Sequence, residues 1–217
     1  MILKVNNLKK HYRYDDYPAI DGLSFDLADG EIATLALGIQ GGKTTLAKIL
    51  TGIEKDFEGE IFFDGKPLTE VLPQDRDIAF FTYPPLFLKG KVKDNIAFGL
   101  KQRKADKATV AQAVKRQSER YGLTDLLDAK VKKLSVSDAF KVSLARAFAR
   151  KVRLAVFDDV LGRDRDIDVV VFDVVEFCRS NGIACLFLSN NITNALGKAL
   201  DFVKFDLQKA MEETKHE

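Results

Sequence analysis

The chain has 217 residues, of which 46% are apolar and 30% are charged. This composition fits one or two packed domains and excludes an intrinsically disordered chain. Its 34 lysines and arginines nearly balance its 32 aspartates and glutamates, so the bulk charge gives no reason to expect nucleic acid or an anionic membrane surface as a partner.

The first third of the chain predicts short strands that are interrupted by one glycine-rich turn. Strands are expected at 2–5, 20–27, 32–37, 60–63 and 78–81. The run at 32–37 enters the glycine-rich turn, and 44–50 after the turn has the apolar spacing of a helix. This order of strand, loop and helix places the turn at the N-terminus of a helix.

The middle third, from about 91 to 150, is rich in alanine and charged residues and has a helical period. It predicts a helical subdomain inserted into the rest of the chain. Further strands are expected at 153–157 and 183–188, each flanked by helical stretches, and a helix is expected at 192–200 before a polar helical tail. Such alternation implies an α/β fold with a largely parallel sheet and helices on its faces.

The strongest chemical signal is the run GGKTT at 41–45. A phosphate group needs backbone N–H groups at a helix N-terminus, a lysine for the outer phosphates and a hydroxyl for Mg²⁺. Lys43 and Thr44 supply the last two. The full phosphate-loop pattern has a glycine six residues before the lysine, where this chain has Leu37, and Gly38 stands one position later. A simple glycine turn before a helix with a solvated lysine remains the alternative.

Five segments in the same order resemble the nucleotide-binding domain of ABC transporters, particularly subunits of sugar-importer type. They are 30–52 around the glycine-rich loop, 74–79 and 94–100 around the glutamine loop, 134–147 at the signature motif, and 154–158 at the Walker B strand. The resemblance covers about residues 2–205. It implies one domain over 1–217, with a P-loop NTPase core, a mainly parallel sheet, an N-terminal antiparallel β part and the helical insertion at about 91–150.

The resemblance also implies that the cofactors are ATP and Mg²⁺. Tyr12 matches the aromatic residue that stacks on adenine, and Asp158 matches the Walker B aspartate that acts with Thr44 on Mg²⁺. The other nucleotide contacts that it implies are Gly38, Gly41, Gly42, Lys43, Thr44, Thr45 and Ser135.

Several catalytic positions depart from the family pattern. Tyr83 stands for the glutamine of the glutamine loop, Asp159 for the catalytic glutamate and Asn190 for the switch histidine, and the signature LSGGQ reads LSVSD at 134–138. Asp159 is one methylene shorter than glutamate, and Asn190 cannot carry a proton. Val136 replaces a glycine and resists the positive φ that a glycine allows. We therefore expect ATP hydrolysis to be slow or absent.

The same residues have simpler structural interpretations. These are a capping box from Ser135 to Asp138, a packed surface aromatic at Tyr12, an apolar anchor at Tyr83 before two prolines, a helix N-cap at Asn190 and a solvated turn at Asp158 and Asp159. Both kinds of interpretation hold together for Ser135, because a residue that caps a helix is also free to belong to a signature motif.

The expected location follows from what the sequence lacks. Cys178 and Cys185 lie in apolar surroundings without the spacing of a metal site. The N-terminus has no basic segment followed by an apolar run, and no stretch approaches 18 consecutive apolar residues. We expect a cytoplasmic protein that does not cross the bilayer by itself, and the resemblance places it peripherally on the inner face of the cell membrane.

Two functions remain open at this point. The first is an ATP-binding subunit that associates with membrane permease subunits and couples nucleotide binding, with slow hydrolysis, to solute transport. The second is an inactive pseudo-ATPase that forms the structural or regulatory half of a heterodimer. The implied partners are the permease, which would dock on the apolar run 80–89, and a second nucleotide-binding subunit in a homodimer or heterodimer; no nucleic acid is expected.

Overall fold

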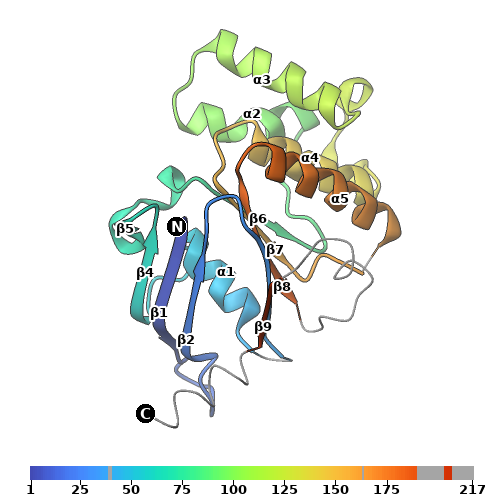
Figure 1. The fold of residues 1–217 in the computed structure, drawn as a ribbon. Helices are drawn as coiled ribbons and strands as arrows, with labels where there is room; N and C mark the ends of the chain where they lie inside the picture. The colour runs from blue at the N-terminus through green and yellow to red at the C-terminus, as the bar shows by residue number, and fades with distance from the viewer. Residues whose placement is uncertain (39–40, 163, 190–202, 207–217) are drawn as a thin grey trace. The chain divides into compact units, whose positions relative to one another are not determined.

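The computed structural model describes residues 1–38, 41–162, 164–189 and 203–206 (Figure 1). By its internal contacts the chain forms two compact units. The first unit holds residues 1–78, 153–159 and 175–217, and the second holds residues 79–152 and 160–174. In the described part of the chain no helix is both long and apolar enough to span a membrane.

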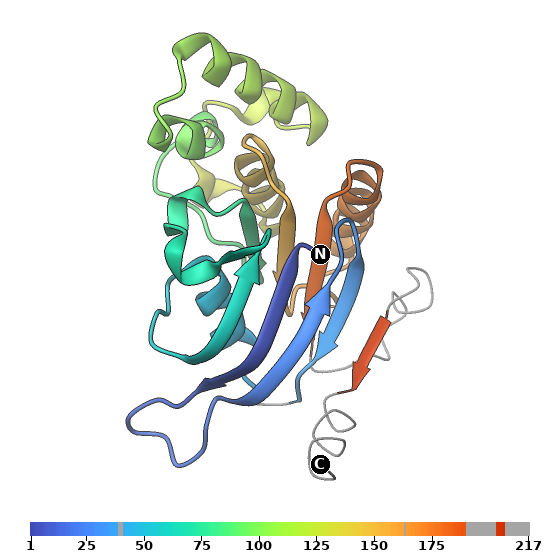
Figure 2. The same ribbon diagram turned by 60° about the vertical axis from the view of Figure 1, so that its left-hand side comes forward.

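An antiparallel sheet in the first unit is formed by four strands. They are β1 (Leu3–Lys10), β2 (Ile20–Leu27), β4 (Glu58–Phe63) and β5 (Lys66–Pro67), in the order β2, β1, β4, β5 (Figure 2). The strand predicted at 2–5 runs on to Lys10, because a register shift between Val5 and Leu8 lets the polar residues between them pass without ending the strand. The predicted N-terminal antiparallel part is confirmed.

The first unit also contains a parallel sheet, and the predicted site residue Asp158 is the last residue of one of its strands. Its strands β7 (Leu154–Asp158), β8 (Ala184–Ser189), β3 (Ile32–Ala36) and β9 (Val203–Asp206) lie in that order. All of β7 and the first five residues of β8 are buried, which is typical of parallel strands covered on both faces. β9, which pairs with β3, was not predicted. The helix predicted at 192–200 and the tail from 207 lie outside the described residues.

Helix α1 (Lys43–Thr51) follows β3 and is one residue longer at each end than predicted. It begins after Gly42 and ends at Gly52, and both glycines have a left-handed backbone with φ of 76° and 78°. A glycine adopts this conformation without the Cβ penalty of other residues, so both ends of the helix are set by the sequence.

The C-terminal end of α1 is held by a buried arginine. Two short 3-10 turns, η1 (Leu68–Glu70) and η2 (Pro73–Asp75), lead to Arg76, which is 7% exposed. Its guanidinium donates to the carbonyl oxygens of Ile49 at 3.0 Å and Leu50 at 2.8 Å, in the last turn of α1. It also donates to the carbonyls of Leu68 at 3.0 Å and Val71 at 3.1 Å. Arg76 thus adds donors to the carbonyls at the end of α1, where the Ile49 carbonyl also accepts the Gly52 N–H at 3.0 Å.

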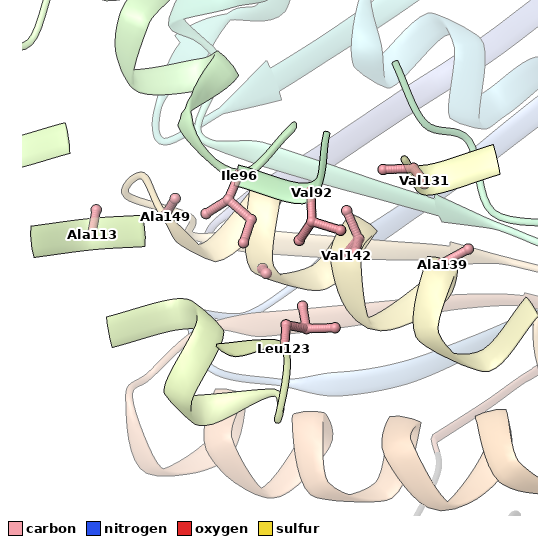
Figure 3. Packing of buried hydrophobic residues seen from close by; sticks show 9 residues of the cluster. Val92, Ile96, Ala113, Leu123, Val131, Ala139, Val142 and Ala149 are labelled. Carbon is pink, nitrogen blue, oxygen red and sulfur yellow. The ribbon is translucent and has the colours of Figure 1, made fainter. Parts of the chain in front are cut away.

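The second unit is mainly helical. It contains most of β6 (Ile78–Thr82), then α2 (Val92–Gln102), α3 (Lys107–Arg120), η3 (Thr124–Leu126), η4 (Val131–Lys133), α4 (Val136–Phe148) and the first ten residues of α5 (Arg165–Ser180). Valine, isoleucine, leucine and alanine side chains from α2, α3, α4 and the turns between them form one apolar core (Figure 3). The helical character predicted for 91–150 is confirmed, whereas its standing as a subdomain within one domain over 1–217 stays a prediction.

Candidate functional site

The loop between β3 and α1 is closed so tightly that two of its positions admit only glycine. The Gly41 N–H donates to the Gly38 carbonyl at 3.0 Å. A Cβ on Gly41 would lie 2.9 Å from the carbonyl carbon of Leu37, and a Cβ on Gly42 would clash with the carbonyl oxygen of Ala19. Leu37 itself is buried, with 3% of its surface exposed, so its side chain belongs to the core.

The N-terminus of α1 faces this loop without side-chain compensation. Gly42 holds the N-cap position, and the first turn of α1 contains no acidic residue. The first N–H groups of a helix have no partner within the helix, and the helix dipole makes this end positive. Lys43, the first residue of α1, adds a positive charge. The loop and helix end therefore have the backbone and charge of an anion-binding site.

A threonine and an aspartate meet beside this helix end. The Thr44 hydroxyl donates to Oδ2 of Asp158 at 2.7 Å. Asp158 is the last residue of β7 and only 7% exposed, and its Oδ1 is buried without a hydrogen-bond donor among the described residues. Burial raises the pKa of the Asp158 carboxyl above its ordinary value, against the lowering effects of the Thr44 hydrogen bond and the Lys43 charge.

This pair of side chains fits a magnesium ion. A buried carboxylate oxygen without a donor, next to a threonine hydroxyl, offers the hard oxygen ligands that Mg²⁺ prefers. The described residues contain no cluster of three or more His, Cys, Asp or Glu side chains that could hold a metal ion by itself. Mg²⁺ usually binds with one or two carboxylates, phosphate oxygens and water, so the sparse set at Thr44 and Asp158 suits an ion that arrives with a phosphate ligand.

The burial of Asp158 has a consequence for stability. Its pKa is higher in the folded chain than the ordinary value of 3.8. The free energy of unfolding therefore falls as the pH rises from 3.8 through the pKa of the folded chain, because the unfolded chain ionises more easily. We expect Asp158→Asn to stabilise the nucleotide-free protein by about 0.5–2 kcal/mol at pH 7. At pH 3, where both states are protonated, the gain should vanish. Urea unfolding at the two pH values tests this, and a loss of stability at pH 7 would show that the carboxylate is well satisfied.

Tyr12 lies against the same helix. Its side chain is half-buried, and its hydroxyl is 3.4 Å from the hydroxyl of Thr45 in α1. The ammonium group of Lys10 lies 4.9 Å from the centroid of the Tyr12 ring. The structure thus brings together Tyr12, Thr45, Thr44, Asp158 and the glycine-rich loop in the first unit, and the stacking of Tyr12 on adenine stays a prediction.

The three predicted catalytic positions are Asp159, Tyr83 and Asn190. Asp159 is half-buried with a left-handed φ of 51°, and its N–H donates to the Leu188 carbonyl at 2.9 Å. Tyr83 is half-buried in the second unit. Asn190 lies outside the described residues.

Ser135 is the N-cap of α4, as the capping interpretation predicts. Its hydroxyl accepts the Asp138 N–H at 3.0 Å and donates to the Asp138 carboxylate at 2.8 Å. The Asp138 carboxylate also accepts a hydrogen bond from the Lys141 ammonium group at 3.2 Å. The carboxylate therefore contacts the Ser135 hydroxyl, whereas in the usual capping box it accepts the N-cap N–H.

Lys10 was not identified as a site residue from the sequence, although its ammonium group contacts the ring of Tyr12. A lysine at the end of a strand is usually solvated. The signal that could have found it is the strand alternation, because Lys10 shares the buried face of β1 with Leu8.

The fold and the loop define a P-loop nucleotide-binding domain, and comparisons with known proteins agree. The family profile described as ABC transporter matches residues 20–162. The chain is 34% identical over 202 residues to the putrescine transport ATP-binding protein PotG of Escherichia coli strain K12, covering 91% of this chain and 53% of that protein. It is 34% identical over 178 residues to the tungstate uptake system ATP-binding protein TupC of Peptoclostridium acidaminophilum, covering 82% and 79%. The chain belongs to the ABC transporter family.

Other relatives and solved structures are consistent with this assignment. The oligosaccharides import ATP-binding protein MsmX of Bacillus subtilis strain 168 is 29% identical over 204 residues, covering 93% of this chain and 56% of that protein. The chain thus spans about half the length of PotG and MsmX. The structure of cbiO1 from Clostridium perfringens, part of the ABC transporter complex cbiONQ, matches with a TM-score of 0.74 at 24% identity, covering 89% and 80%. A dimeric ATP-binding cassette bound to ADP and Pi matches with a TM-score of 0.75 at 17% identity, covering 88% and 89%. These likenesses confirm the predicted P-loop NTPase fold.

Proposed function

We propose that the chain is the ATP-binding subunit of an ABC import system and binds Mg²⁺-ATP at the loop 38–45. The observation that carries this proposal is the contact between Thr44 and Asp158 beside the N-terminus of α1, with one Asp158 oxygen buried and without a donor. The family assignment supports it, since PotG, TupC and MsmX are all named as ATP-binding proteins of transport or uptake systems.

Each residue of the first unit has a separate role in this proposal. The N–H groups of the loop and of the first turn of α1 would bind the phosphates, together with Lys43. Thr44 and Asp158 would hold Mg²⁺, which supplies charge neutralisation at the phosphate oxygens. Tyr12 would stack on the adenine. The glycines at 41 and 42 let the loop backbone close against Leu37, Gly38 and Ala19, because a side chain at either position has no space.

We infer that hydrolysis is slow. Asp159 is too short to place an attacking water as a glutamate does, and a misplaced general base loses about 10²–10⁴-fold in rate. In the second unit, the Ser135 hydroxyl is engaged with Asp138, whose carboxylate adds negative charge beside the signature serine. The alternative of an inactive pseudo-ATPase gains no support from the relatives named above.

Binding and turnover of the wild-type chain test this function together. Calorimetric titration should show saturable ATP binding in Mg²⁺ that weakens when a chelator removes the metal. A phosphate-release assay on the same sample should give a turnover below about 1 s⁻¹, the lower end of ordinary enzymes. A titration without heat or saturation would refute ATP binding, and a turnover within the ordinary range would refute the inference of slow hydrolysis.

The partner that we propose is a membrane permease, docked on the loop that follows β6. Leu86, Phe87 and Leu88 are 62%, 42% and 38% exposed. The loop is nevertheless fixed, since the Asn95 side chain bonds both the N–H and the carbonyl of Leu88, at 2.8 and 3.0 Å. Arg146 donates to the Leu86 carbonyl at 2.7 Å. A fixed loop that exposes three large apolar side chains is typical of a docking surface.

Replacing two of these side chains tests the docking surface. The double variant Phe87→Ser, Leu88→Ser should fold and bind ATP normally, but it should recover about tenfold less permease when a tagged chain is purified from solubilised membranes. The matched control is Ile53→Ser, Leu72→Ser, which removes two apolar side chains that are 68% and 59% exposed in the first unit. Equal recovery of permease by both double variants would refute docking at this loop.

We further propose that a second nucleotide-binding subunit completes the assembly on the inner face of the membrane. The dimeric cassette bound to ADP and Pi has the same fold as this chain, which is consistent with a dimer. The choice between a homodimer and a heterodimer belongs to the co-purification experiment, because a different second subunit would be recovered as a separate chain.

A further inference from the structure

Lys10 is a buried lysine at the end of β1. Its side chain is 5% exposed, and its ammonium group lies 3.0 Å from the Asp56 carboxylate and 3.5 Å from the Glu54 carboxylate. Lysine is almost never buried to this degree unless it is paired. The ion pairs with Asp56 and Glu54 explain why the charge of Lys10 can be buried.

The ammonium group also lies over an aromatic face. Its Nζ is 4.9 Å from the centroid of the Tyr12 ring, within the range of a cation–π interaction. The hydroxyl at the tip of the Tyr12 ring is 3.4 Å from the Thr45 hydroxyl in the first turn of α1. The ring is therefore held at one face by a cation and at its tip by the helix that carries Lys43 and Thr44.

One of the two residues whose carboxylates hold Lys10, Glu54, is linked to the same helix. The Glu54 carboxylate accepts the N–H groups of Lys55 and Asp56, each at 2.9 Å. The N–H of Glu54 donates to the Lys48 carbonyl in α1 at 3.1 Å. The contacts thus form a closed path that leaves α1 through Glu54, crosses Lys10 and Tyr12, and returns to α1 at Thr45.

We propose that Lys10 is a positioning residue, which sets the plane of the Tyr12 ring for stacking on the adenine base. This inference rests on the proposed function, in which Tyr12 receives the base. A ring that is already oriented loses less conformational freedom when the base binds, and such preorganisation improves affinity. Replacing Lys10 should therefore lower the affinity only for ligands that carry a base, and it should leave the phosphate contacts of the loop unchanged.

Affinities for ATP and for inorganic tripolyphosphate, both with Mg²⁺, separate base binding from phosphate binding. Lys10→Met should weaken ATP binding about three- to tenfold and change tripolyphosphate binding less than about twofold. Lys10→Arg, which keeps the cation, should restore most of the ATP affinity. Lys9→Met is the matched control, because Lys9 is the exposed neighbour on β1, and it should change neither affinity. Unchanged ATP affinity in Lys10→Met, or equal loss for both ligands, would overturn the inference.

A second readout needs no nucleotide. The chain contains no tryptophan, so Tyr12→Trp places a single tryptophan at the ring position, and its emission can be excited apart from that of the remaining tyrosines. In this background Lys10→Met should raise the acrylamide quenching constant about twofold or more, whereas Lys9→Met should not. Asp56→Asn, at a side chain that is 95% exposed, should raise the quenching constant to a smaller extent. This variant serves as the test if Lys10→Met does not fold. Quenching that is the same in all variants would overturn the inference even if ATP binds. A wild-type chain that binds neither ATP nor tripolyphosphate would instead refute the proposed function.

Discussion

Lys43→Ala should weaken the binding of Mg²⁺-ATP by about 30- to 150-fold, which corresponds to about 2–3 kcal/mol. Lys43 begins α1 directly after the closed glycine loop, and a charge-assisted hydrogen bond to phosphate belongs to the strong class. Calorimetric titration of the variant measures the loss. Because Lys43 also lowers the pKa of the Asp158 carboxyl through its charge, the titration should be carried out at pH 7 and above.

The matched control for Lys43 is Lys55→Ala. Lys55 is exposed and lies in the first unit, after α1. Its removal takes away the same charge without touching the loop, so the affinity should change less than about twofold at 0.15 M salt, where exposed charges are largely screened. Equal losses in the two variants would mean that Lys43 acts only through the overall charge, and the assigned phosphate contact would be wrong.

Arg76→Met should destabilise the protein by about 3–4 kcal/mol, because it removes a donor from four carbonyl groups and only those of Ile49 and Leu68 also accept a backbone N–H among the described residues. Burial lowers the pKa of the Arg76 guanidinium, so removal of the buried charge offsets part of the lost stability. Thermal unfolding followed by circular dichroism should show a Tm lower by about 6–15 °C.

The control for Arg76 is Arg116→Met, at an exposed position of α3. It should shift the Tm by less than about 2 °C, because surface substitutions usually stay within about 0.5 kcal/mol. A Tm of Arg76→Met equal to that of Arg116→Met would show that the helix-end carbonyls find other partners.

Much of the fold could be predicted because its main elements obey local rules. The buried strands β3 and β7 are mostly apolar, and α1 is bounded by glycines whose left-handed backbone ends a helix. β9 was not found, since four residues near the end of the chain acquire a strand conformation only by pairing with β3. β1 was found only in part, because its register shift breaks the alternation on which a prediction depends.

The candidate site shows the same division between local and long-range information. The glycine loop could be predicted from a local motif, and the structure adds that Gly41 and Gly42 have no room for a side chain. The pairing of Thr44 with Asp158, 114 residues later, was expected only through the family resemblance. The role of Lys10 could not be predicted, because it depends on Glu54 and Asp56 folding against Lys10 and Tyr12 from a segment more than 40 residues earlier.

Hydrogen–deuterium exchange with and without the ligand shows whether Mg²⁺-ATP binds at the loop 38–45 and at Tyr12. Saturating Mg²⁺-ATP should slow exchange in peptides that cover 38–46, where backbone N–H groups would bind phosphate, and in the peptide that contains Tyr12. Peptides of α3 in the second unit should exchange at the same rate in both conditions. Exchange at 38–46 that is unchanged by saturating Mg²⁺-ATP would show that the nucleotide does not bind at this loop.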